Sequence, residues 1–166
     1  MRKCTILVLL CLSVAVLSFV VGCTTPQRPS SVPPTPKSPT PVLVPQSRNL
    51  VNATITVGPG KHYAIPFSVD VNVMRDVRVV GSFRASGGSG NDIKAIIMDD
   101  MAYINWVNGH QVSVLYSSGQ ITAANINTAI IISGKYHLVF SNGFSTFSSK
   151  SVSTRVDLEW TELRYQ

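Results

Sequence analysis

Cysteine and charge are scarce in this chain of 166 residues, and each shortage excludes a class of protein. The three cysteines lie at positions 4, 11 and 23, so the remainder can form no disulfide and no cysteine-based nucleophile or metal site. Only 13% of the residues are charged, and from Asn49 onward nine basic residues face eight acidic ones. Nucleic-acid binding needs a dense basic surface, because phosphate neutralisation supplies most of the affinity. The composition therefore argues against nucleic acid as a partner.

Recognisable catalytic motifs are missing as well. The segment Gly87–Asn91 departs from the nucleophile motif Gly-x-Ser-x-Gly at its last position, and no Lys-Ser/Thr pair follows it to hold a phosphate. The three histidines are scattered along the chain, at His62, His110 and His137. Polar residues near His110 that could share acid–base or metal chemistry with it are Asp99, Asp100 and Asn105. We predict a protein that is not an enzyme and needs no cofactor or metal, with a hydrolase built around His110 as the remote alternative.

The first 23 residues predict export. Two basic residues precede an apolar run from Ile6 to Val21, and the small Gly22 stands before Cys23, which is the order of a secretory signal peptide. The ending Val-Val-Gly-Cys resembles the bacterial lipobox, in which the leader is cut before a cysteine that carries acyl chains. The resemblance implies that residues 1–22 are removed and that Cys23 is lipidated, with palmitate among its acyl chains.

The alternative for this leader is an uncleaved membrane anchor. The apolar run is shorter than the roughly 20 residues that cross a bilayer, which favours the cleaved form. Both forms keep the basic end inside and place the rest of the chain on the extracytoplasmic side. The membrane is therefore the first predicted partner, and two or three acyl chains would hold the protein to it lastingly.

Residues 23–48 predict a lipid-anchored, disordered linker. The stretch 24–47 contains eight of the ten prolines, which lack the N–H that helices and sheets require and favour extended polyproline II. At about 3.1 Å for each residue, such a linker reaches roughly 70 Å.

Residues 49–166 predict one all-β domain. Apolar and polar residues alternate in segment after segment, and turn residues separate the segments at regular intervals. Pro66 interrupts one of these strands and indicates an edge strand or an outward-facing position. No segment has a helical period over three turns. We therefore expect an antiparallel β-sandwich of about eight strands, of the jelly-roll kind.

The stretch from Gly134 to Trp160 predicts two consecutive strands near the centre of this sandwich. Its second half places five residues on the inner face: Val152, Thr154, Val156, Leu158 and Trp160. The connecting loop carries Phe144 and Phe147. Loops seldom carry such residues without burying them, so we expect the loop to fold back on the core.

Parts of the domain resemble the GOLD domain, the lumenal β-sandwich of secretory-pathway cargo receptors. The first part is Phe83–Ile93, which has a glycine-rich loop before Asp-Ile. The second is Gly134–Asn142, which has the spacing Gly-x-Tyr-x-φ-x-Phe-x-Asn. The third is Phe144-Ser145 followed by Lys150–Val152. The resemblance covers roughly residues 62–160. It implies the sandwich fold and a non-catalytic interaction role. Val139 stands where eukaryotic members usually carry a disulfide-forming cysteine.

Two kinds of ligand site are considered in the loops. Aromatic faces beside amide side chains suit sugars, and the candidate residues are Tyr103, Asn105, Trp106, Asn108 and Tyr116, in and after the segment from Tyr103 to Gln111. The alternative is that Trp106 fills one end of the sandwich core. Oxygen ligands for Ca²⁺ are available at Asp92, Asp99 and Asp100, although ordinary turn chemistry accounts for them too.

Together these features predict a cell-envelope lipoprotein whose β-sandwich is a non-catalytic protein-interaction module. The alternative is a module that binds carbohydrate or cell wall through the Tyr103–Gln111 segment. The predicted partners are accordingly the membrane and either an envelope protein or a glycan.

Overall fold

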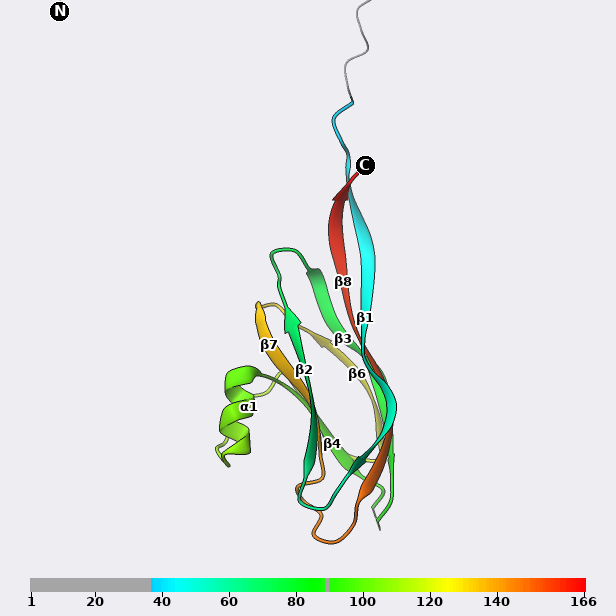
Figure 1. Ribbon diagram of the computed structural model, residues 1–166, viewed down its shortest axis with the longest axis vertical. Helices are drawn as coiled ribbons and strands as arrows, with labels where there is room; N and C mark the ends of the chain where they lie inside the picture. The colour runs from blue at the N-terminus through cyan, green and yellow to red at the C-terminus, as the bar shows by residue number, and fades with distance from the viewer. Residues whose placement is uncertain (1–36, 89) are drawn as a thin grey trace, which may run out of the picture. The chain divides into compact units, whose positions relative to one another are not determined.

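A computed structural model describes residues 37–88 and 90–166, and the chain divides into the units Met1–Lys37 and Ser38–Gln166. The second unit contains eight strands and one helix. Figure 1 shows their arrangement. They are β1 (Pro41–Val57), β2 (His62–Val69), β3 (Arg75–Ser86), β4 (Ile93–Asp99), α1 (Asp100–Val107), β5 (Tyr116–Ile121), β6 (Ala123–Ala129), β7 (Gly134–Ser141) and β8 (Lys150–Tyr165). The predicted signal peptide, the lipidation site at Cys23 and most of the predicted linker lie outside the described residues.

The strands form two four-stranded sheets with the order of a jelly roll. The first sheet has the order β1-β8-β3-β6, and the second has the order β2-β7-β4-β5. All pairings are antiparallel, and the pairs β1–β8, β2–β7, β3–β6 and β4–β5 are those of one long hairpin folded across itself. The predicted all-β sandwich of about eight strands is confirmed.

The main core fills the space between the two sheets. It is built by the alternation read from the sequence, since residues two apart on a strand share a face. In β8 the residues Val152, Thr154, Val156 and Leu158 are buried, and Trp160 packs against the edge of the core. Both β7 and β8 are inner strands, although they belong to different sheets. Pro66 lies on β2, an edge strand, as predicted.

The folded domain begins earlier than its predicted boundary at Asn49. Strand β1 starts at Pro41 and pairs with the end of β8, where Pro41 lies opposite Tyr165. Proline is tolerated there because β1 is the edge of its sheet, where one side of the strand needs no ladder partner. The last residues of the predicted linker, 41–48, are therefore strand, and the disorder expected for them is wrong.

Helix α1 lies in a segment for which no helix was predicted. Asp99 caps its first turn, because the Asp99 carboxylate accepts a hydrogen bond from the backbone N–H of Ala102 at 2.7 Å. The Asn108 side chain donates to the carbonyl of Ile104 at the other end. Eight residues are about two turns, too few for the three-turn period sought in the sequence.

Asn142 and Lys150 join the loops at one end of the sandwich. The fully buried Asn142 amide donates to the carbonyls of Val57, Gly58 and Ser148 at 3.2, 3.0 and 2.8 Å. The buried Lys150 ammonium contacts the Asp92 carboxylate at 2.8 Å, which holds the pKa of that carboxyl below its usual range. These contacts join the β1–β2 turn, the loop before β4 and the β7–β8 loop at one end of the sandwich.

The two phenylalanines of the β7–β8 loop are not buried as expected. The loop does fold back, because the N–H of Gly60 donates to the carbonyl of Ser145 at 2.9 Å. Its side chains nevertheless face outward, with Phe147 92% exposed and Phe144 39% exposed. Backbone hydrogen bonds and the Asn142 amide, rather than aromatic burial, fix this loop.

Candidate functional site

Helix α1 packs against the outer face of the second sheet and forms a small second core there. The buried members are Ile96, Met98, Ala102 and Val139, and the partly buried ones are Ala64, Tyr103, Trp106 and Val112. Strands β4 and β7 are thus covered on both faces, which explains why they read as nearly continuous apolar runs. The helix is therefore held in one position on a rigid sheet.

Aromatic and histidine side chains make the contact between α1 and the sheet. The Tyr103 ring stacks on His137 of β7, with centroids 4.0 Å apart and planes 13° apart. The Tyr103 hydroxyl lies 3.1 Å from Nε2 of His62, whose ring meets the edge of Trp106 at 5.0 Å. The sequence placed Tyr103 and Trp106 together correctly but missed both histidines, which come from distant strands.

His137 also fixes the first turn of α1. Its Nε2 donates to the Asp100 carboxylate at 2.7 Å, and the Lys135 ammonium lies 4.0 Å from the same oxygen. These contacts hold the pKa of Asp100 below its usual range, with the His137 hydrogen bond as the largest cause. His137 is buried, while the Asp100 side chain stays 39% exposed, so the hydrogen bond ties the first turn of α1 to β7 at the edge of the contact.

Acidification should loosen α1 through Asp100. Because its folded-state pKa is lowered, Asp100 stabilises the helix contact above its unfolded pKa of about 3.9, and this contribution is lost as the pH falls below that value. In a Trp160→Phe background, we expect Trp106 fluorescence to change below about pH 4. Asp100→Asn should weaken the contact at neutral pH and flatten the acid transition. An unchanged acid transition in that variant would show that Asp100 is not its cause.

The outward side of α1 carries three large apolar side chains beside the exposed Asn105. Met101 is 69% exposed and Ile104 is 49% exposed, and they lie three residues apart on one side of the helix. Val107, at the end of the helix, is 52% exposed. We call these three residues the α1 surface. Two further exposed apolar residues, Val114 and Leu115, lie in the segment between α1 and β5.

The structure separates the five residues predicted to bind a sugar. Tyr103 and Trp106 lie on the side of α1 that packs against the sheet, and His137 covers one face of the Tyr103 ring. Asn108 caps the helix, while Asn105 is exposed. Tyr116 belongs to β5, packs against the main core and donates its hydroxyl to the Asn125 carbonyl at 3.3 Å. Trp106 does not fill an end of the main core either, because it lies on the outer face of a sheet.

The residues weighed as alternatives for an acid–base site and a calcium site do not converge. His110 is exposed, and its N–H donates to the Asn105 carbonyl. Asp92 and Asp99 stand at opposite ends of β4, about 20 Å apart at strand spacing, and Asp99 is occupied in capping α1. Among residues 37–88 and 90–166, no three His, Cys, Asp or Glu side chains gather as metal ligands. In the same residues, no helix is long and apolar enough to cross a membrane.

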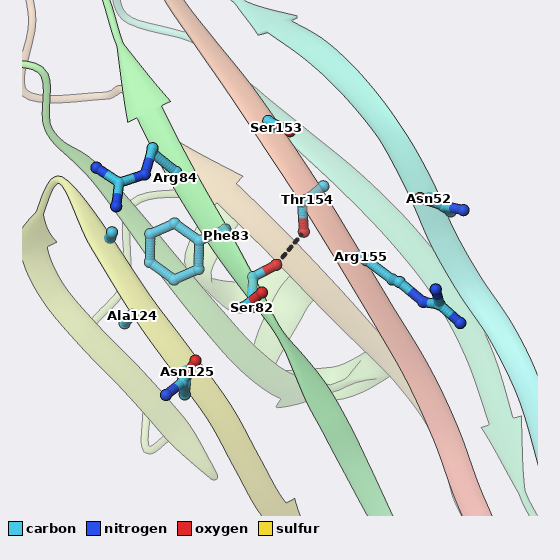
Figure 2. Close-up of a pocket in the computed structure, with 10 residues that line it drawn as sticks. Asn52, Ser82, Phe83, Arg84, Ala124, Asn125, Ser153, Thr154 and Arg155 are labelled. Carbon is cyan, nitrogen blue, oxygen red and sulfur yellow. Dashed lines mark hydrogen bonds between the residues drawn. The ribbon is translucent and has the colours of Figure 1, made fainter.

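The outer face of the first sheet carries a hollow of about 580 Å³ (Figure 2). Seven polar residues from all four strands line it. Thr154 is buried, and the six at outward strand positions are Asn52, Ser82, Arg84, Asn125, Ser153 and Arg155. We call these six residues the sheet hollow. Sequence reasoning missed it because the residues come from four separate segments. The sequence signal that could have indicated this surface is the set of polar residues that alternate with the core residues of each strand, such as Ser153 and Arg155 in β8.

Comparison with known proteins adds no family assignment, since no protein-family model and no curated protein sequence matches this chain.

Proposed function

We propose that this protein is a lipid-anchored cell-envelope protein whose sandwich binds another protein through the α1 surface. The observation that supports it is the exposure of Met101 and Ile104 on a helix held firmly against the sheet. Surface helices normally carry polar residues on their outward side. The partner chemistry that fits is an apolar patch on an extracytoplasmic protein.

Preorganisation makes α1 suited to this role. The helix is capped at both ends, and its inward side is fixed by the Tyr103–His137 stack and the His137–Asp100 hydrogen bond. Little conformational entropy is then lost when a partner covers the outward side. Burying apolar side chains such as Met101 and Ile104 contributes about 1.5–3 kcal/mol for each when burial is complete.

A protein partner suits this surface better than a sugar. Sugar binding by stacking needs an exposed aromatic face beside hydrogen-bonding groups. The large outward side chains of α1, Met101, Ile104 and Val107, are aliphatic or thioether groups beside the exposed Asn105, and Tyr103 and Trp106 are turned toward the sheet. Catalysis is not proposed, because the histidine–carboxylate pair beneath the helix serves to hold it.

The docking proposal is tested with the full chain in envelope extract. Met101→Ser together with Ile104→Ser should reduce capture of the specific partner at least about tenfold, since each lost tenfold corresponds to about 1.4 kcal/mol. Phe147→Ser is the matched control, because it removes an even more exposed apolar side chain from a different part of the domain. Retention of the partner by the double variant, or its loss only with Phe147→Ser, would contradict the proposal.

The anchoring part of the proposal rests on the Cys23 sequence and has a separate test. Cys23→Ser should abolish labelling by radioactive palmitate and leave a precursor that still carries residues 1–22. The change in mass on a gel and the label are both read from whole cells. A Cys23→Ser protein that is processed and labelled normally would exclude lipidation at this residue.

A further inference from the structure

We propose that the sheet hollow binds an anionic glycan, whose negative groups are carboxylates or phosphates. This surface lies on the first sheet and does not involve α1, so the inference goes beyond the proposed docking function.

The register aligns one polar row across the whole sheet. Asn52 of β1 lies opposite Arg155 of β8, which lies opposite Ser82 of β3, which lies opposite Asn125 of β6. Directly paired residues share a face, so all four side chains belong to the outer face. Four strands at about 4.8 Å spacing give a row about 14 Å long, which fits an extended oligomer lying across the strands.

A second row of outward-facing residues, next to the first, contributes the other arginine of the hollow, Arg84. Arg84 of β3 lies opposite Ser153 of β8 on one side and Ala123 of β6 on the other. The two arginines therefore stand on adjacent strands in successive rows, and Figure 2 shows Asn52 and Asn125 on the strands to either side. The small Ala123 lines the hollow on β6 beside Arg84, where a larger side chain would fill it.

The charge of the hollow favours an anion. No carboxylate lines it, and Arg84 makes no ion pair with any described residue. Arg155 has a side chain that is 71% exposed, and its Nε lies 3.5 Å from the Asp157 carboxylate, which leaves much of the guanidinium free. Guanidinium groups bind carboxylate and phosphate oxygens with two parallel hydrogen bonds.

The neutral groups of the hollow favour a glycan among the anionic polymers. Amide and hydroxyl side chains, as at Asn52, Asn125 and Ser82, both donate and accept, which matches sugar hydroxyls. Single-stranded nucleic acids are bound with aromatic side chains that stack on bases. The only aromatic residue that lines the hollow is Phe83, which is buried in the main core.

Binding is measured with the full chain and defined polymers. Polygalacturonate supplies carboxylates and phosphomannan supplies phosphates, with unmodified mannan as the neutral control. We expect retardation in an affinity gel containing one or both anionic glycans and none with mannan. Arg84→Ala and Arg155→Ala should each weaken binding by about 10-fold or more, the loss expected for a charged hydrogen bond. Arg164→Ala, which removes the same charge from the opposite face of β8, should leave it unchanged.

Three results would overturn the proposal. One is the absence of retardation by both anionic glycans. Another is equal loss of binding in Arg164→Ala and in the two hollow variants, which would indicate general charge attraction. The third is equal binding of polyglutamate or oligothymidylate, which would show that the hollow does not select glycans. Thermal unfolding of each variant establishes that the first sheet is intact.

Discussion

Replacing Asn142 by alanine is expected to destabilise the domain by about 3 kcal/mol, because one buried amide serves three backbone carbonyls. The carbonyls belong to the β1–β2 turn and the β7–β8 loop, and the backbone N–H of Asn142 bonds to Lys61 as well. Alanine leaves the buried Val57 carbonyl without this donor, removes two part-buried hydrogen bonds and leaves a gap at a fully buried position. A fall of about 10 °C in the melting temperature is the measurable result.

The matched control for this prediction is Asn127→Ala. Asn127 accepts one exposed hydrogen bond from Arg78 at 2.8 Å, and its loss should cost under about 0.5 kcal/mol. Equal melting temperatures for the two variants would show that the Asn142 amide does not organise the loops. Asn142→Asp should be at least as damaging as Asn142→Ala, because its oxygens would face the same carbonyls.

The substitution Gly81→Ala is expected to disturb the fold at least as strongly. Gly81 lies in the middle of β3 opposite Val156 of β8, and a Cβ at this position would come within 2.6 Å of the Val156 Cα and still closer to the Arg155 carbonyl. These are backbone atoms of a strand bonded on both sides, so they cannot turn away as a side chain would. We expect a loss of about 3 kcal/mol or more, or failure to fold.

Gly58→Ala provides the control for Gly81. The Cβ added at Gly58 would meet only the Lys61 side chain, at 3.6 Å, which is an ordinary contact. Its unfolding free energy should therefore stay within about 0.5 kcal/mol of the original protein. Comparable stability of Gly81→Ala and the original protein, measured by urea unfolding, would refute the close approach of β3 and β8.

The sandwich could be predicted because its strands follow simple alternation. In β8, five successive inward residues identify the core face from sequence alone, and the structure places four of them in the buried core. The limits of β1 were missed for a physical reason. Pro41 and Pro45 look like linker residues, and only the pairing with the end of β8 makes strand formation favourable there.

The site was predictable only in part. Tyr103 and Trp106 are three residues apart, so their closeness in space followed from the segment itself, although the helix that carries them was not predicted. His62 and His137 could not be assigned to them, because β2 and β7 bring these residues in from 41 and 34 positions away. The same limit applies to the sheet hollow, whose row joins residues 52, 82, 125 and 155 through strand register.

Photocrosslinking from the α1 surface tests the central claim most directly. A photoreactive phenylalanine analogue is placed at position 101, 104 or 147 of the full chain, and cells are irradiated before the envelope is isolated. The proposal predicts one common protein crosslinked from positions 101 and 104 and absent from position 147. Crosslinks to that protein from position 147 alone, or no protein crosslink from either helix position, would contradict it.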